Sequence, residues 1–179
     1  DHCQALLWET PDAMAYLRGR GLRDNTIRAA RLGWCPGYPP PERWYEKSGD
    51  SAARWGLNPA EYPQGVKMAR GWVIPCEMAG VLWYVKVRRP EPDMAAERAK
   101  GKDPAKYLCV AGSRKAGAIY GLDPARGAVD VILAEGEFNA LLLRQELAGV
   151  AAVVSVGDAG NRPGRQAMAT RLRPSCFAR

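Results

Sequence analysis

The order of elements expected in the last fifty residues constrains the fold more than any other feature of the sequence. An apolar run, VILA (131–134), ends in Glu135, Gly136 and Glu137, and leucines then recur at helical spacing up to residue 147. A second apolar run (150–157) follows, and then a basic segment of helical composition (162–174). Strand, helix, strand and helix in this order predict two buried strands of a parallel α/β sheet.

The acidic turn lies at the carboxyl end of the first of these strands, which is where ligands bind in such sheets. Glu137 fits a helix-start residue, because a negative charge in the first turn interacts favourably with the helix dipole. Local structure explains Glu135 less well than Glu137. A carboxylate at the end of a strand is solvated, held by a cation or engaged in chemistry. Mg²⁺ needs few protein oxygens, because it keeps waters and binds substrate phosphates. Glu135 is therefore the candidate for catalysis and for metal binding.

The net charge of the chain is +7, and its basic residues cluster in three segments, 18–31, 86–115 and 162–179. This excess favours a polyanionic partner, most simply nucleic acid, although a solvated basic surface would give the same composition. Two short helices are expected over residues 12–33, and they either pack on the core or read DNA. Residues 90–105 contain three prolines and are expected to form a mobile polar loop.

Several classes of protein are disfavoured by composition. No apolar stretch approaches the roughly 18 residues that a membrane-spanning helix needs, and no signal peptide is visible. The only histidine is His2, and the five cysteines are widely spaced. A structural zinc site and histidine catalysis are therefore not expected, and the cysteines fit reduced, mostly buried thiols of a cytoplasmic protein.

Residues 71–89 are the clearest β-hairpin, with two β-branched, apolar runs on either side of a turn at Gly80. In the second run, Lys86 and Arg88 alternate with valines and share one face of the strand. We therefore expect one cationic face and one buried face.

Five segments together resemble, in their order along the chain, the catalytic core of bacterial DnaG-type primases, including the Toprim fold. They are AYLRGRGLRDNTIRAARLGWCPG (15–37), the hairpin (71–89), KYLCVAGSRKAGAIYGL (106–122), VILAEGEFNALLL (131–143) and VVSVGDAG (153–160). Each motif alone carries little information, but their shared order covers nearly the whole chain. The resemblance implies an α+β primase-core subdomain over residues 1–117, followed by a partial α/β Toprim domain with parallel strands over 118–179.

The resemblance also implies roles for individual residues. Glu135 matches the Toprim glutamate, which binds metal or acts in acid/base chemistry. Arg88, Lys106 and Lys115 match basic residues of the family, and Lys86 joins them on the hairpin as nucleic-acid-binding candidates. The implied reaction is RNA primer synthesis on single-stranded DNA from ribonucleoside triphosphates with Mg²⁺ or Mn²⁺. The implied partner is a replicative helicase or a fused helicase domain, and no membrane is involved.

The chain also departs from the family pattern. Asn139 stands where the motif usually has aspartate, Asp158 replaces a threonine, and Lys86 and Val87 replace small residues. The DxD motif, the N-terminal zinc-binding domain and a helicase-binding tail are not seen. We therefore expect a fragment of a primase or of a phage or mobile-element primase-helicase, inactive on its own.

Two alternatives remain open. A non-catalytic, Toprim-like nucleic-acid-binding module would explain Asn139 and the missing acids. Another Toprim enzyme, such as a nuclease or topoisomerase, is less compatible with the hairpin and the KYL segment, because these belong to the primase half of the pattern.

Overall fold

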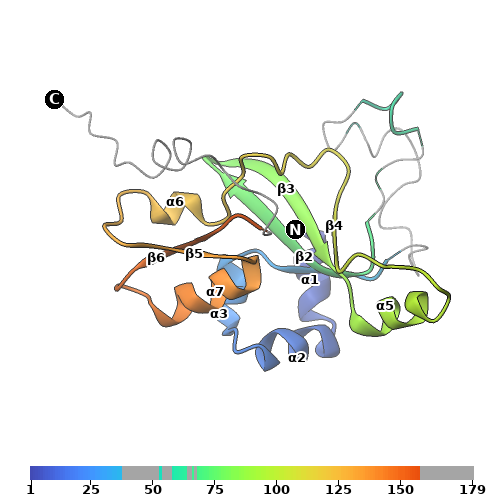
Figure 1. Cartoon of the computed structure of the whole chain (residues 1–179), viewed down its shortest axis with the longest axis horizontal. Helices are drawn as coiled ribbons and strands as arrows, with labels where there is room; N and C mark the ends of the chain where they lie inside the picture. The colour runs from blue at the N-terminus through green and yellow to red at the C-terminus, as the bar shows by residue number, and fades with distance from the viewer. Residues whose placement is uncertain (38–52, 54–57, 64–65, 67, 158–179) are drawn as a thin grey trace. The chain divides into compact units, whose positions relative to one another are not determined.

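The structure is a computed structural model that describes residues 1–37, 53, 58–63, 66 and 68–157 (Figure 1). In chain order its helices and strands are α1 (His2–Trp8), α2 (Pro11–Gly19), α3 (Asp24–Ala29), β1 (Gly33–Cys35), β2 (Gly71–Met78), β3 (Val81–Arg88), α5 (Glu91–Arg98), β4 (Tyr107–Cys109), α6 (Leu122–Ala125), β5 (Val131–Ala134), α7 (Glu137–Glu146) and β6 (Ala152–Ser155). The fold is mixed α/β. Within the described ranges, no helix combines the length and apolar character that crossing a bilayer needs.

The first sheet has four strands in the order β1-β2-β3-β4. The β1–β2 and β3–β4 pairs are antiparallel, and β2 and β3 are joined by a turn at Ala79 and Gly80. Both turn residues have positive φ, 53° and 73°, as a type I′ hairpin turn requires. The predicted hairpin over residues 71–89 is therefore confirmed.

The second sheet pairs β5 with β6 in parallel, and α7 connects the two strands. The predicted strand-helix-strand order is confirmed for these elements. The basic helix predicted over residues 162–174 lies outside the described residues. An isolated antiparallel bridge joins Tyr120 to Ser155 on β6.

The chain divides into two compact units, each built from three segments. Unit 1 consists of Asp1–Ala13, Leu32–Ile74 and Val85–Ser113. Unit 2 consists of Met14–Arg31, Pro75–Tyr84 and the chain from Arg114 onward. The domain boundary expected after residue 117 stays a prediction.

Unit 1 has an apolar core beside the sheet. Its buried members are Cys35, Val66, Met68, Val73, Val85, Val87 and Val110. Trp34 and Trp72, which face each other across β1 and β2, add an edge-to-face ring contact at 5.1 Å. Cross-strand packing of this kind fixes the strand register, because a slip of one residue would turn every apolar side chain to the other face.

In unit 2, α7 is tied to the segment that carries α3. The side-chain oxygen of Gln145 accepts hydrogen bonds from the Thr26 hydroxyl and from the backbone N–H of Arg23, both at 2.8 Å. The side-chain amide of Gln145 donates to the carbonyl of Gly21 at 2.9 Å. These bonds fix the carboxyl-terminal half of α7.

Two expectations about secondary structure were wrong. Residues 90–105 were expected to form a polar loop, but α5 occupies Glu91–Arg98. Pro90 and Pro92 lie at its N-cap and first turn, where a missing N–H costs no hydrogen bond, and Met94 is buried. The other correction concerns β5, which was expected to be buried, although Leu133 is 53% exposed and Ile132 is also exposed. Among the described strands, β5 pairs only with β6.

Candidate functional site

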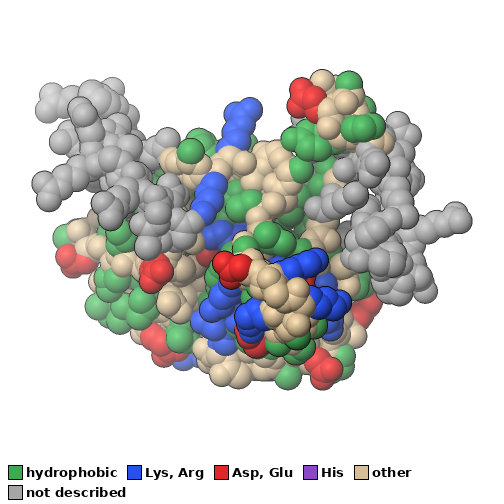
Figure 2. Space-filling view, turned by 45° about the vertical axis from the view of Figure 1, so that its right-hand side comes forward, with side chains coloured by type: hydrophobic (Ala, Val, Ile, Leu, Met, Phe, Trp, Pro, Cys, Tyr) green, Lys and Arg blue, Asp and Glu red, His purple; other side chains and the backbone are tan. Residues whose placement is uncertain are grey.

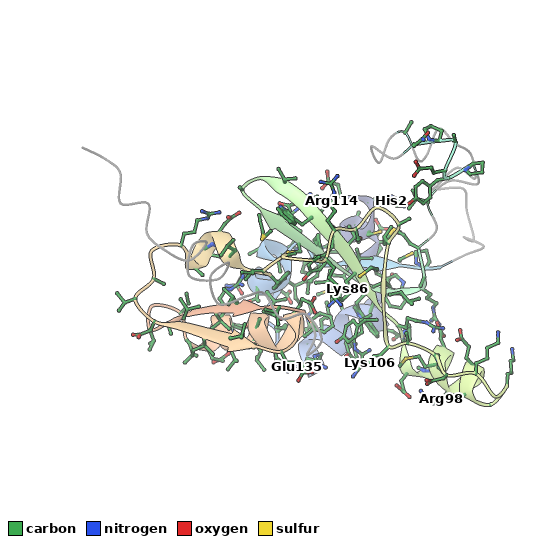
Figure 3. The ribbon with its side chains drawn as sticks, turned by 45° about the horizontal axis from the view of Figure 1, so that its top comes forward. His2, Lys86, Arg98, Lys106, Arg114 and Glu135 are labelled. Atoms are coloured by element: carbon green, nitrogen blue, oxygen red, sulfur yellow. The ribbon has the colours of Figure 1, made fainter. Side chains whose placement is uncertain are left out.

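Glu135 follows directly after β5, and its side chain is exposed (Figure 3). Its backbone carbonyl accepts a hydrogen bond of 2.9 Å from the Ser155 hydroxyl, and that hydroxyl accepts one of 3.0 Å from the backbone N–H of Gly157. Gly136 is the N-cap of α7. The backbone at Glu135 is therefore attached to the end of β6, while the carboxylate faces solvent.

Glu137 is the first residue of α7, as the sequence predicted, but its environment was not predicted. Its side chain is only 1% exposed, and its carboxylate accepts a hydrogen bond of 2.8 Å from the Tyr84 hydroxyl. Burial, and next the nearby Glu137 carboxylate, raise the pKa of the Tyr84 phenol well above its ordinary value. Tyr84 therefore stays protonated at neutral pH and acts as the donor.

Asn139, which stands in place of the aspartate of the motif, is exposed on the first turn of α7. Its amide oxygen accepts a hydrogen bond of 3.3 Å from the guanidinium of Arg20. That guanidinium lies 5.1 Å from the ring centre of Phe138 and also donates to the Tyr16 hydroxyl at 3.2 Å. A cation therefore lies beside the helix that follows the acidic turn.

Sequence reasoning did not single out Arg20 as a site residue. The residue was counted among the arginines of the first segment, and no local pattern separates it from Arg18 or Arg23. Only the structure distinguishes these arginines, because Arg18 pairs with Asp24, Arg23 pairs with Glu146, and Arg20 reaches the first turn of α7.

In unit 1, the ammonium groups of Lys86 and Lys106 contact the same aromatic ring. Their nitrogens lie 5.3 Å and 6.0 Å from the ring centre of Tyr107, within the range of cation–π attraction. Lys106 is exposed, whereas Lys86 is only 2% exposed. The structure thus brings together two of the predicted nucleic-acid-binding residues around Tyr107.

The expectation of an open cationic face on β3 was wrong. Arg88 is 8% exposed, and its guanidinium lies 5.4 Å from the ring centre of Trp72 on β2. Lys86, on the same face, lies against Tyr107. Aromatic rings cover the cations, so both faces of this part of β3 are buried.

Among the described residues of unit 1, several exposed basic side chains gather on α5 and the loop after it (Figure 2). They are Arg98, Lys100, Lys102 and Lys106. The acidic residues of α5 pair with arginines, as in the Arg70–Asp93 pair at 2.7 Å and the Arg89–Glu97 pair. Much of the net positive charge of this region therefore comes from the lysines of the loop.

Lys115 belongs to unit 2, as Glu135 does. It is half-buried in the loop before α6, where its carbonyl accepts a hydrogen bond of 3.0 Å from the backbone N–H of Ala118. The backbone N–H of the preceding residue, Arg114, donates to the carbonyl of Trp83 on β3 at 2.7 Å. The loop that carries Lys115 is thus attached to β3.

The described residues do not form a metal site by themselves. No group of three or more histidine, cysteine, aspartate or glutamate side chains gathers in the described ranges. Near the acidic turn, the carboxylate of Glu137 is occupied by Tyr84, and Asn139 offers a neutral amide to Arg20. Glu135 is the exposed carboxylate of this turn.

The fold of the chain is similar to that of DnaG-type primase catalytic cores. The RNA polymerase domain of Mycobacterium tuberculosis primase DnaG matches with a TM-score of 0.60 and 18% identity, covering 93% of this chain and 56% of that chain. A DnaG primase catalytic domain bound to single-stranded DNA matches with a TM-score of 0.60 and 19% identity, covering 96% and 57%. The Escherichia coli primase catalytic core matches with a TM-score of 0.55 and 18% identity, covering 87% and 51%.

The resemblance inferred from the five motifs is thus confirmed at the level of the fold. The chain spans little more than half the length of these three solved structures. No protein-family model matches the chain, and neither does any curated protein.

Proposed function

We propose that the chain is part of a cytoplasmic DNA primase, which synthesises RNA primers on single-stranded DNA from ribonucleoside triphosphates. The observation that carries this proposal is the exposed carboxylate of Glu135 at the carboxyl end of β5, in a fold shared with DnaG primase catalytic cores. In nucleotidyl transfer, a hydroxyl group attacks the α-phosphate and pyrophosphate leaves. Such reactions depend mainly on positioning and charge neutralisation.

Of the four basic residues proposed from the sequence, Lys106 and Lys115 are assigned direct contacts with template or nucleotide phosphates. Lys86 and Arg88 are buried against Tyr107 and Trp72, so they would add positive charge from beneath these rings. Support is strongest for Lys106, which is exposed and shares the Tyr107 ring with a second ammonium group, that of Lys86. Single-stranded nucleic acid is bound mainly through backbone phosphates and base stacking, so few base-specific contacts are needed. Arg20 joins these candidates, because its guanidinium reaches the first turn of α7.

In the full-length protein, Glu135 would supply one ligand to Mg²⁺ or Mn²⁺ or act in acid/base chemistry. A metal there would lower the charge of the triphosphate. Further ligands would have to come from outside the described residues, since no cluster of acids lies within them. The same proposal includes three further points. The region after residue 117 is part of a Toprim domain, the full-length protein works with a helicase, and the chain by itself is inactive.

A second candidate is a non-catalytic, Toprim-like nucleic-acid-binding module. Asn139 favours it, because an amide paired with Arg20 replaces the acid of the motif. This module would bind single-stranded DNA but would not extend a primer, whatever residue stands at position 135.

The deciding experiment is primer synthesis by the full-length protein on single-stranded DNA with Mg²⁺ or Mn²⁺. Glu135→Gln should lower the rate by at least about 100-fold, because a group that acts in the reaction contributes this much. Asp130→Asn, an exposed carboxylate at the other end of β5, is the matched control and should leave the rate unchanged. Equal rates for wild type and Glu135→Gln would contradict the role of Glu135, and no synthesis by wild type would favour the binding module.

A further inference from the structure

The acidic turn is attached to its surroundings at two points on either side of Glu135. On one side, the Ser155 hydroxyl of β6 binds the carbonyl of Glu135 at 2.9 Å. On the other side, the Tyr84 hydroxyl of β3 binds the carboxylate of Glu137 at 2.8 Å. All these residues belong to unit 2. The turn is therefore restrained through both its backbone and a side chain, while the Glu135 carboxylate stays exposed.

The Glu137–Tyr84 bond exceeds what a helix start requires. An acidic residue in the first turn interacts with the helix dipole just as well when it is exposed to solvent. Glu137 is instead 1% exposed and Tyr84 is 2% exposed, so both polar groups have been removed from water. Burying a carboxylate is unfavourable unless hydrogen bonds compensate the lost hydration. An exposed acid would stabilise the helix at lower cost, so the buried bond calls for another explanation.

We propose that Glu137 and Tyr84 are a positioning pair, which holds the Glu135–Gly136 turn against β3 and so fixes the direction of the Glu135 carboxylate. This inference rests on the function proposed for Glu135. The hydrogen bond is directional, and it acts two residues from the carboxylate that it positions. Glu137 itself does not touch the substrate, because its carboxylate is buried and bound to Tyr84.

Three variants of the full-length protein test the pair. Tyr84→Phe removes the donor and leaves the ring in place. Glu137→Gln keeps an acceptor oxygen for the Tyr84 hydroxyl. The double variant Tyr84→Phe with Glu137→Leu removes both polar groups, and such an exchange of a buried pair for apolar groups is often neutral for stability. Thr26→Val is the matched control, because it removes a hydrogen bond from Thr26 to Gln145 at the other end of α7.

The first readout is hydrogen exchange of the backbone amides of residues 134–138, which needs neither metal nor substrate. Tyr84→Phe should raise their exchange rate at least about tenfold, since a hydrogen bond to a charged group is lost. Thr26→Val should not change it. The second readout is primer synthesis, where Tyr84→Phe should lower kcat about tenfold or more, as for other residues that orient a functional group. Glu137→Gln should retain most of the activity of wild type.

The double variant separates positioning from stability. If the pair positions Glu135, the double variant regains the unfolding midpoint of wild type but keeps the low kcat. If the pair is only structural, kcat falls in proportion to the loss of stability in every variant. Tyr84→Phe and Thr26→Val then have the same kcat when compared at equal stability. That result overturns the proposal. Glu137→Gln as inactive as Tyr84→Phe would also overturn it, since the charge of Glu137 would then matter by itself.

Failure of the proposed function can be distinguished from failure of this inference. If Glu135→Gln retains full activity, the catalytic role of Glu135 is wrong, whereas the exchange measurement still reports whether the pair restrains the turn. If Glu135→Gln is inactive and Tyr84→Phe changes neither exchange nor kcat, only the positioning pair is wrong.

Discussion

The guanidinium of Arg20 donates a hydrogen bond of 3.3 Å to the amide oxygen of Asn139, a residue 119 positions later in the chain. The same guanidinium lies over the ring of Phe138, the neighbour of Asn139 on α7. A cation is therefore held beside Asn139, at the position where the motif that this chain resembles usually has aspartate. Because of this pair, the effect of a charge at residue 139 can be measured on stability, without a catalytic assay.

Asn139→Asp should stabilise the fold by up to about 1 kcal/mol at low salt, because it turns a neutral acceptor into an ion pair with Arg20. The gain should shrink in high salt, since the pair is largely exposed and therefore screened. Urea unfolding at two ionic strengths measures both effects. Lower stability of Asn139→Asp at low salt would contradict the pairing.

Lys106→Ala should weaken binding of single-stranded DNA and reduce the slope of log affinity against log salt by about 0.7, the amount expected for one phosphate contact. Fluorescence anisotropy with a labelled oligonucleotide over a salt series measures both quantities. Arg126→Ala is the control, because Arg126 is an exposed cation already paired with Asp123 at 3.2 Å. If Lys106→Ala binds with unchanged affinity at low salt, Lys106 does not contact the DNA.

Tyr107→Leu should destabilise the protein by about 1 kcal/mol more than Tyr107→Phe does. Phenylalanine keeps the aromatic face for Lys86 and Lys106, which lie 5.3 Å and 6.0 Å from the ring centre, whereas leucine does not. The comparison isolates the ring from the hydroxyl group. Thermal unfolding of both variants gives the difference, and equal stabilities would show that the ring face contributes nothing.

Ala79→Asn should stabilise the protein by roughly 0.5–1 kcal/mol. Ala79 has a φ of 53° in the hairpin turn, and asparagine tolerates this left-handed conformation better than alanine. Position 79 is exposed, so the larger side chain has room, and the backbone N–H that donates to Asp123 is kept. An unfolding midpoint below that of wild type would contradict this account of the turn.

The stability that the Arg89–Glu97 pair contributes should depend on pH. A hydrogen bond from Arg89 holds the pKa of Glu97 below its ordinary value of 4.5. A lowered pKa in the folded state means that the contribution is complete above pH 4.5 and disappears as the pH falls through the lowered value. Stability measured against pH for wild type and Glu97→Gln should therefore differ at pH 7 and converge in acid.

The parts of the fold that could be predicted are those specified by neighbouring residues. The hairpin follows from two apolar, β-branched runs and a glycine turn, and β5–α7–β6 follows from apolar runs separated by an acidic turn. The prolines of residues 90–105 favour a loop, but Pro90 and Pro92 lie at the start of α5, where a helix tolerates them. Proline at the N-cap or in the first turn therefore marks a helix start as well as a loop.

The candidate site was less predictable, because its contacts join distant parts of the sequence. Tyr84 and Glu137 are 53 residues apart, and no periodicity relates them. Lys86 and Arg88 were correctly placed on one face, but the rings of Tyr107 and Trp72 that cover them come from other strands. Local pattern predicts which face a side chain occupies and leaves open what lies against it.

The exposed apolar side chains of β5 have a practical consequence for work on the purified chain. Ile132 and Leu133 are exposed on a strand that, among the described strands, pairs only with β6, and exposed apolar strands promote association. Light scattering at several protein concentrations should accompany any binding measurement, so that aggregation is not mistaken for affinity. A charged residue at position 133 is the first change to try for a better-behaved sample.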